Sequence, residues 1–302
     1  MGSPSWGASG GTARMWGAVS PRVRAQLPDV ERFHVSKAYK RRIIVEAYVR
    51  SPVTIPEFTI SIGRFTLRVQ VNVHVLRDDE GLESVGVIKF TGLHPGAAIA
   101  VDVTGGRTRG GICALLAPAG AAAPTHFVTC GHIFPPSGTN TRVIAAAKNG
   151  PEVMVGTLVE NRLQRAVKRD VSLVKIEAAG AALVGTGGPK LTSWYSKNNV
   201  FGRHGYTHKP TTQKPSAITT TGDEMVPTWI QAPMWGGYDL DSVLPTADEV
   251  LVRGDSGTIL CTQAGIAMGS AVAIDGGESL FEPLGRTLEL FTSHGLTLWR
   301  NG

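Results

Sequence analysis

The stretch RGDSGTIL, residues 253–260, places a serine between two glycines and next to an apolar run. Gly254 permits a sharp turn in which its own N–H and that of Ser256 point to one spot, an arrangement that stabilises a negatively charged oxygen. Ser256 would then present its hydroxyl on that turn as a nucleophile. Two other interpretations remain: a plain glycine-rich turn between apolar strands, and an exposed Arg-Gly-Asp adhesion tripeptide, which the apolar flanks disfavour.

A serine nucleophile needs a base, and a histidine at the end of a core strand is held well for that role. His132 in HFVTCGHIF, residues 126–134, fits, because Phe127 and Val128 indicate an apolar strand and Gly131 permits a close approach. The seven other histidines lie in the N-terminal part, in polar loops, at a strand start or near the C-terminus. A lone histidine is more often structural, but the companion motifs favour His132 as the base.

The third member of such a site is a carboxylate that orients the imidazole. Asp170 in KRDVSLVKI, residues 168–176, begins an apolar strand, so its side chain can lie at the rim of a barrel beside the histidine. Asp102 is the runner-up, although it precedes the histidine strand. Asp239 and Asp241 lie in a loop that the sequence does not place.

Three blocks, TCGH (129–132), RDVSLVKI (169–176) and RGDSG (253–257), resemble the motif blocks of trypsin/chymotrypsin-like serine peptidases of the PA clan. Their order is the family's order, and the resemblance covers about residues 105–300. It implies a mainly β fold of two six-stranded antiparallel β-barrels with the site between them.

The resemblance also implies roles for individual residues. His132 would act as general base and then general acid, Asp170 as the orienting group and Ser256 as the nucleophile. The amides of Gly254 and Ser256 would form the oxyanion hole.

The chain departs from the family's pattern in several places. Cys130 stands where alanine is usual, and Thr258 where a second glycine is usual. Ile133 follows the histidine in place of a disulfide cysteine, which favours an intracellular member. The stretch IIVEAYV, a proline-bearing linker and a second strand precede the barrels, which resembles bacterial-type members with an N-terminal extension. In the family, cleavage ahead of the first barrel releases an apolar N-terminus that pairs with the aspartate before the serine. No sequence of that kind occurs near residues 100–112, so we expect Asp255 to have another partner, such as a backbone N–H.

Composition supports a mainly β fold class. The chain has 42% hydrophobic residues, 37 glycines and 18 prolines among short β-branched runs, which favours many strands joined by turns. The sequence contains no signal-peptide pattern and no membrane-spanning stretch. An odd number of cysteines, Cys113, Cys130 and Cys261, predicts free thiols in a reducing compartment, hence a cytoplasmic protein.

Changes in composition along the chain predict four parts. They are a flexible leader (1–26), a small α+β appendage (27–96), a first β-barrel (97–185), and a second β-barrel with a C-terminal helix (186–302). Leu284, Leu288 and Phe291 fall on one face of that helix.

We therefore expect a serine endopeptidase that acts on protein or peptide substrates without a metal or cofactor. The alternative is an inactive or latent double-barrel scaffold that binds a protein partner, and the appendage is a candidate site for a regulatory partner. A metal site at Cys130 and His132 lacks two further ligands. The formal charge of +6 comes from residues 1–110, but its basic residues are scattered, so nucleic acid is not an expected partner.

Motif alignment also indicates the substrate pocket. Val250 takes the place of the pocket base, which favours small or medium apolar side chains, whereas a shift of two residues would bring Asp248 there and favour Lys or Arg. Ala271, Val272 and Ala273 are the expected strand partners of an extended peptide.

Overall fold

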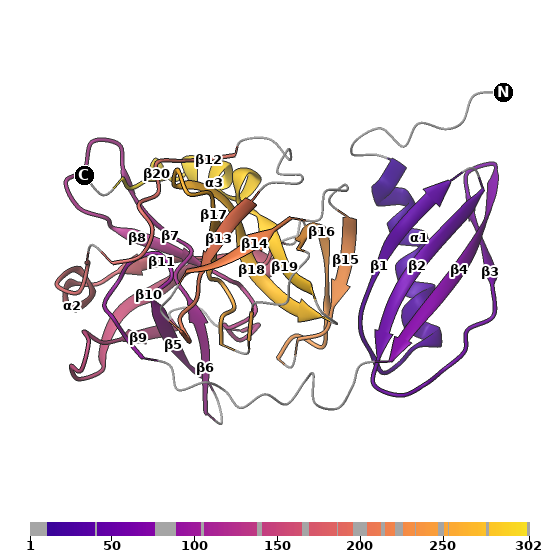
Figure 1. Ribbon diagram of the computed structural model, residues 1–302, viewed down its shortest axis with the longest axis horizontal. Coiled ribbons are helices and arrows are strands. Elements are labelled where there is room, and N and C mark those ends of the chain that lie inside the picture. The colour runs from indigo at the N-terminus through magenta and orange to yellow at the C-terminus, as the bar shows by residue number, and fades with distance from the viewer. Residues whose placement is uncertain are drawn as a thin grey trace. The chain divides into compact units, whose positions relative to one another are not determined.

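The computed structural model divides the chain into two compact units (Figure 1). Unit 1 consists of residues 1–82 and 226–243, and unit 2 of residues 83–225 and 244–302. The structure describes residues 11–39, 41–75, 89–103, 106–137, 141–164, 169–185, 187–195, 204–212, 215–220, 226–232, 234–246, 251–252, 254–275 and 278–300.

Unit 1 is a twisted sheet with one helix. Its strands run in the order β3-β4-β2-β1-β15-β16, and every neighbouring pair is antiparallel except β2 and β4. The bounds are β1 Val30–Tyr39, β2 Arg42–Val49, β3 Phe58–Ile62, β4 Phe65–Val75, β15 Val226–Ile230 and β16 Tyr238–Pro245. Alternation of buried and exposed residues along β2 gives the sheet one apolar face.

Helix α1, Gly11–Gln26, is the main departure from the sequence analysis, which predicted a flexible leader at 1–26. Met15, Trp16, Val19 and Val23 are buried on one side of this helix, in the same core as the sheet. Trp16 Nε1 and Ser20 Oγ both donate hydrogen bonds to Asp239 Oδ1, at 3.0 and 2.9 Å. The prediction was wrong because Gly/Ser-rich composition conceals an apolar stripe whose partners are distant in sequence.

The appendage also gains strands that the sequence analysis assigned to the second barrel. β15 and part of β16, within residues 226–243, complete its sheet beside β1. Trp229 lies in the core of unit 1, where its ring stacks on Phe33 at 5.6 Å between centroids, and Phe33 also contacts Trp16 at 5.3 Å.

In unit 2 the first barrel is an antiparallel sheet with the strand order β20-β7-β8-β11-β10-β9-β5-β6. The bounds are β5 Ala98–Val103, β6 Gly106–Gly111, β7 Ala114–Pro118, β8 His126–Thr129, β9 Arg142–Ala145, β10 Val153–Asn161, β11 Ser172–Ile176 and β20 Leu296–Leu298. Within the described residues this sheet has eight strands where six were predicted, because β6 extends it and β20 joins from near the C-terminus. Two short helices follow its strands, η1 Arg162–Gln164 and α2 Ala178–Ala181.

The second barrel has the strand order β14-β13-β17-β18-β19-β16, with the short strand β12 parallel to β18. The bounds are β12 Ser193–Trp194, β13 His204–His208, β14 Pro215–Thr219, β17 Ile259–Cys261, β18 Ile266–Asp275 and β19 Glu278–Pro283. Helix α3, Leu284–Thr292, buries Leu284, Leu288 and Phe291 against β18 and β20, which confirms the predicted C-terminal helix. The mainly β, double-barrel fold class of chymotrypsin-like type is thus confirmed (Figure 1).

All three cysteines, Cys113, Cys130 and Cys261, are buried free thiols, as predicted. None of the helices in the described part of the chain has the length and apolar character needed to cross a bilayer.

The Phe33 cluster gives a stability prediction for unit 1. We expect Phe33→Ala to destabilise the intact chain by about 3–5 kcal/mol, because the substitution leaves a cavity between two indole rings. Phe65→Ala is the matched control, since Phe65 is 45% exposed, and it should cost no more than about 0.5 kcal/mol. Urea unfolding followed by tryptophan fluorescence measures both changes, and equal losses in the two variants would contradict the packing described here.

Candidate active site

His132 and Asp170 are brought together by the pairing of β8 with β11. Thr129 lies opposite Ser172 at the end of that ladder, so the residues just beyond it on both strands approach each other. His132 Nδ1 lies 2.7 Å from Asp170 Oδ2. The carboxylate therefore contacts the ring through Nδ1.

Asp170 is completely buried, and backbone groups satisfy its second oxygen. The N–H groups of Gly131 and His132 donate to Oδ1 at 2.7 and 2.8 Å. These hydrogen bonds fix the plane of the carboxylate relative to the imidazole.

Asn161 supports the turn that carries the histidine. Its Nδ2 donates to the carbonyl oxygen of Gly131 at 2.9 Å, and its Oδ1 accepts from the N–H of Leu163 at 3.0 Å. A Cβ atom on residue 131 would lie 2.7 Å from Asn161 Oδ1, so this approach requires glycine. The tight approach expected at Gly131 is therefore present.

Electrostatics favour a charged His132. The side chain is only 16% exposed, and burial alone would lower the pKa of its imidazole. The charge and hydrogen bond of Asp170 outweigh that effect, so the pKa of His132 is raised above its usual value. The pair is thus arranged to stabilise an imidazolium, as a general base requires.

The loop that carries Ser256 lies directly against the residues that precede His132. The N–H of Gly111 donates to the carbonyl oxygen of Ser256 at 2.7 Å. A Cβ on residue 257 would lie 2.7 Å from the amide nitrogen of Cys130. Gly254 and Gly257 have φ values of 100° and 82°, a region that favours glycine, so the turn around Ser256 depends on both.

Asp255 anchors the loop that carries Ser256. It is fully buried and accepts hydrogen bonds from Val252 N–H at 3.0 Å, from Thr211 Oγ1 at 2.8 Å and from Thr211 N–H at 3.3 Å. Burial raises the pKa of Asp255 although these donors act in the opposite direction. The expectation that this aspartate has a partner such as a backbone N–H is confirmed.

The expected substrate-pairing residues lie on β18, but one of them is already engaged. Ala271 donates its N–H to Thr258 O at 2.8 Å and accepts from Gly257 N–H at 2.7 Å. The prediction that Ala271 pairs with a peptide is therefore wrong, because the loop that carries Ser256 uses its backbone groups. Val272 stands at a bulge between Ala271 and Ala273 in the ladder with β19. Val250 and Asp248 lie outside the described residues.

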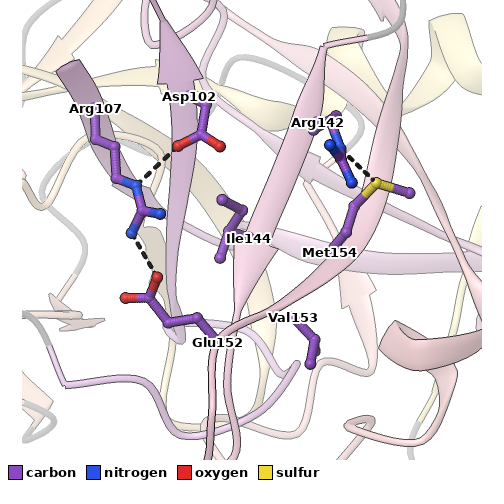
Figure 2. A pocket seen from close by; sticks show the side chains of 7 residues that line it. All are labelled: Asp102, Arg107, Arg142, Ile144, Glu152, Val153 and Met154. Atoms are coloured by element: carbon purple, nitrogen blue, oxygen red, sulfur yellow. Dashed lines mark hydrogen bonds and ion pairs between the residues drawn. The ribbon is translucent and has the colours of Figure 1, made fainter.

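Asp102, the alternative orienting carboxylate, faces a different part of the first barrel. It accepts a hydrogen bond from Arg107 Nε at 2.8 Å, and Arg107 also binds Glu152 at 2.5 Å. Figure 2 shows these three side chains around a shallow surface pocket that contains neither His132 nor Ser256. Asp239 was expected in a loop, but it lies in strand β16 within unit 1, where it accepts hydrogen bonds from Trp16 and Ser20. Among the described residues, no cluster of three His, Cys, Asp or Glu side chains is suited to a metal ion.

Sequence reasoning missed one charged residue at the site, Glu282. It is fully buried in β19, accepts a hydrogen bond from the N–H of Asp170 and pairs with Arg169. A usable signal was present, since a carboxylate inside the apolar run LFEPL, residues 280–284, needs a specific partner.

Comparisons with known proteins give only structural likenesses. No protein-family model matches the sequence, and no curated protein matches it closely enough to count as a relative. Among solved structures, the active form of the Rv3671c protease from M. tuberculosis is 15% identical, with 76% of this chain and 97% of that chain covered and a TM-score of 0.46. A serine protease of a human pathogenic astrovirus is 15% identical over 66% of this chain and 96% of that chain, with a TM-score of 0.38. The inactivated protease paralogue S-D1 of the scabies mite is 15% identical over 67% and 94%, with a TM-score of 0.41.

The histidine–carboxylate pair gives a prediction that does not depend on activity. NMR titration of the intact chain should show the His132 imidazole with a pKa above its usual value of about 6.5. In Asp170→Asn the pKa should fall below that value, because burial then acts alone. Asp102→Asn removes an equal charge from the Arg107 pair and should leave the titration unchanged; a shift in this control instead would make Asp102 the partner.

Proposed function

We propose that the protein is a serine endopeptidase that cleaves peptide bonds through an acyl-enzyme. The observation that carries the proposal is the buried Asp170–His132 pair, with the Ser256 loop packed against the same turn. These are the parts that nucleophilic acyl transfer needs: an oriented base, a hydroxyl on a sharp turn and nearby amides.

In the proposed mechanism Ser256 Oγ attacks the carbonyl carbon of the substrate while His132 Nε2 takes the hydroxyl proton. The N–H groups of Gly254 and Ser256 stabilise the resulting oxyanion. The C–N bond then breaks, and His132 returns the proton to the leaving amine. Water attacks the acyl-enzyme with the same base and releases the acid and Ser256.

The substrate would bind as an added strand on β18. The ladder between β17 and β18 ends near Ser270, and Ala271 bonds the nucleophile loop, so β18 offers backbone groups from Val272 onward. We therefore assign the pairing role to Val272 and Ala273. An extended peptide in that place would bring its scissile carbonyl toward Ser256.

The nucleophile is tested with a fluorophosphonate probe. We expect the intact chain to be labelled and Ser256→Ala not to be labelled, because the probe phosphonylates an activated serine with loss of fluoride. An unlabelled wild type would favour the alternative of an inactive or latent scaffold.

Alanine at His132, Asp170 or Ser256 should each remove most turnover of a peptide substrate. A double variant should lose no more than the worse single variant. Each variant should retain about 10³–10⁴ of the acceleration over water.

Specificity is tested with a panel of fluorogenic peptides that differ in the residue before the cleaved bond. We expect Ala, Val and Leu to be favoured, because Val250 at the pocket base cannot compensate the desolvation of a guanidinium or ammonium group. Cleavage of Arg or Lys substrates at least about tenfold faster, a difference of ~1.4 kcal/mol, would contradict the placement of Val250 at the pocket base. In that case Asp248→Ala should abolish the preference.

A further inference from the structure

Glu282 is a charged side chain without contact to solvent, which requires a physical reason. It lies in β19 opposite Ser270 of β18, and its neighbours Phe281 and Leu284 are fully buried. Burial of an isolated carboxylate is strongly unfavourable, so a buried glutamate persists only where other groups stabilise it.

The groups that stabilise Glu282 belong to the segment that carries the candidate orienting carboxylate. The backbone N–H of Asp170 donates a hydrogen bond to Glu282 Oε2, and Arg169 Nη1 lies 3.6 Å from Oε1. Arg169 is itself buried, with 7% of its side chain exposed. A strand of the second barrel is thereby bound to the segment that leads into β11 of the first barrel.

This tie acts on the candidate site in two ways. The hydrogen bond fixes the backbone of Asp170, and so the position of the carboxylate that meets His132 Nδ1. The Glu282 charge also balances Arg169, which is adjacent to Asp170 in the chain. Without that balance a buried cation would stand beside Asp170 and oppose formation of the imidazolium on His132.

We propose that Glu282 is a positioning residue that acts through Asp170, holding its backbone and, with Arg169, setting the charge behind His132. The proposal rests on the proposed peptidase function for its catalytic meaning, but its effect on the imidazole is independent of turnover. Among the described residues, the thiols of Cys113 and Cys130 interact electrostatically with Glu282 and Asp170, respectively. Burial raises the pKa of both thiols, so they stay neutral over the range in which His132 titrates.

Two single substitutions with opposite charge effects test the proposal in the intact chain. Glu282→Gln keeps the shape and an oxygen acceptor for the Asp170 N–H but leaves Arg169 uncompensated. It should lower the pKa of His132 in an NMR titration by about one unit. Arg169→Met leaves Glu282 uncompensated and should raise that pKa by a similar amount. The double variant Arg169→Met/Glu282→Gln should return it close to the wild-type value.

The pH profile of peptide hydrolysis gives the second readout. The acid limb of kcat/KM should move to lower pH in Glu282→Gln and to higher pH in Arg169→Met, and Glu282→Gln should lower kcat about 10- to 100-fold. Glu152→Gln is the matched control, because it breaks the exposed Arg107–Glu152 pair on the first barrel and should change neither readout.

The outcomes separate this proposal from the proposed function. An unchanged His132 titration in both single variants, or shifts of the same sign, would overturn the role of Glu282 even in an active peptidase. Loss of kcat with an unshifted titration would show that Glu282 only supports folding. If wild type hydrolyses no peptide and reacts with no probe, opposite shifts in the titration still support the coupling while the peptidase proposal fails. If Glu282→Gln does not fold, Arg169→Met and the double variant carry the comparison.

Discussion

Burial of the Asp170 carboxylate is the constraint on which the candidate site depends. Such a group is tolerated only where hydrogen-bond donors replace the water it has lost. The turn after β8 supplies those donors as the N–H groups of Gly131 and His132, and the imidazole adds a third contact. All three require Thr129 to lie opposite Ser172, so the register of one strand pair fixes the position of the base.

Backbone contacts hold the Ser256 loop next to the turn that carries His132. Gly111 N–H bonds the carbonyl of Ser256, and residue 257 approaches Cys130 too closely for a side chain. Ala271 completes the arrangement by bonding residues 257 and 258. The loop that carries Ser256 is therefore bonded to both barrels. A change in the packing of either barrel would alter the geometry of the candidate site.

The parts of the molecule that could be predicted from sequence are those whose requirements are local. Short apolar strands, together with the resemblance of three motif blocks to a known family, predicted the double barrel and the His132–Asp170 pair, with Asp102 as the alternative carboxylate. Helix α1, β20 and the role of Glu282 could not be found in this way, because each depends on a partner far away in sequence. Ala271 was assigned wrongly for a similar reason: its backbone bonds to residues 257 and 258 follow from the folded loop.

Unit 1 illustrates how such distant dependence shapes folding. Residues 1–82 supply four strands and a helix, but Phe33 lacks its stacking partner until Trp229 has been added. Closing a flexible loop across residues 83–225 would have a large entropic cost, which grows with loop length. That stretch belongs to unit 2, so the sheet of unit 1 depends on residues separated in sequence by most of a second unit. Such non-local pairing explains why composition along the chain could not reveal the boundaries of unit 1.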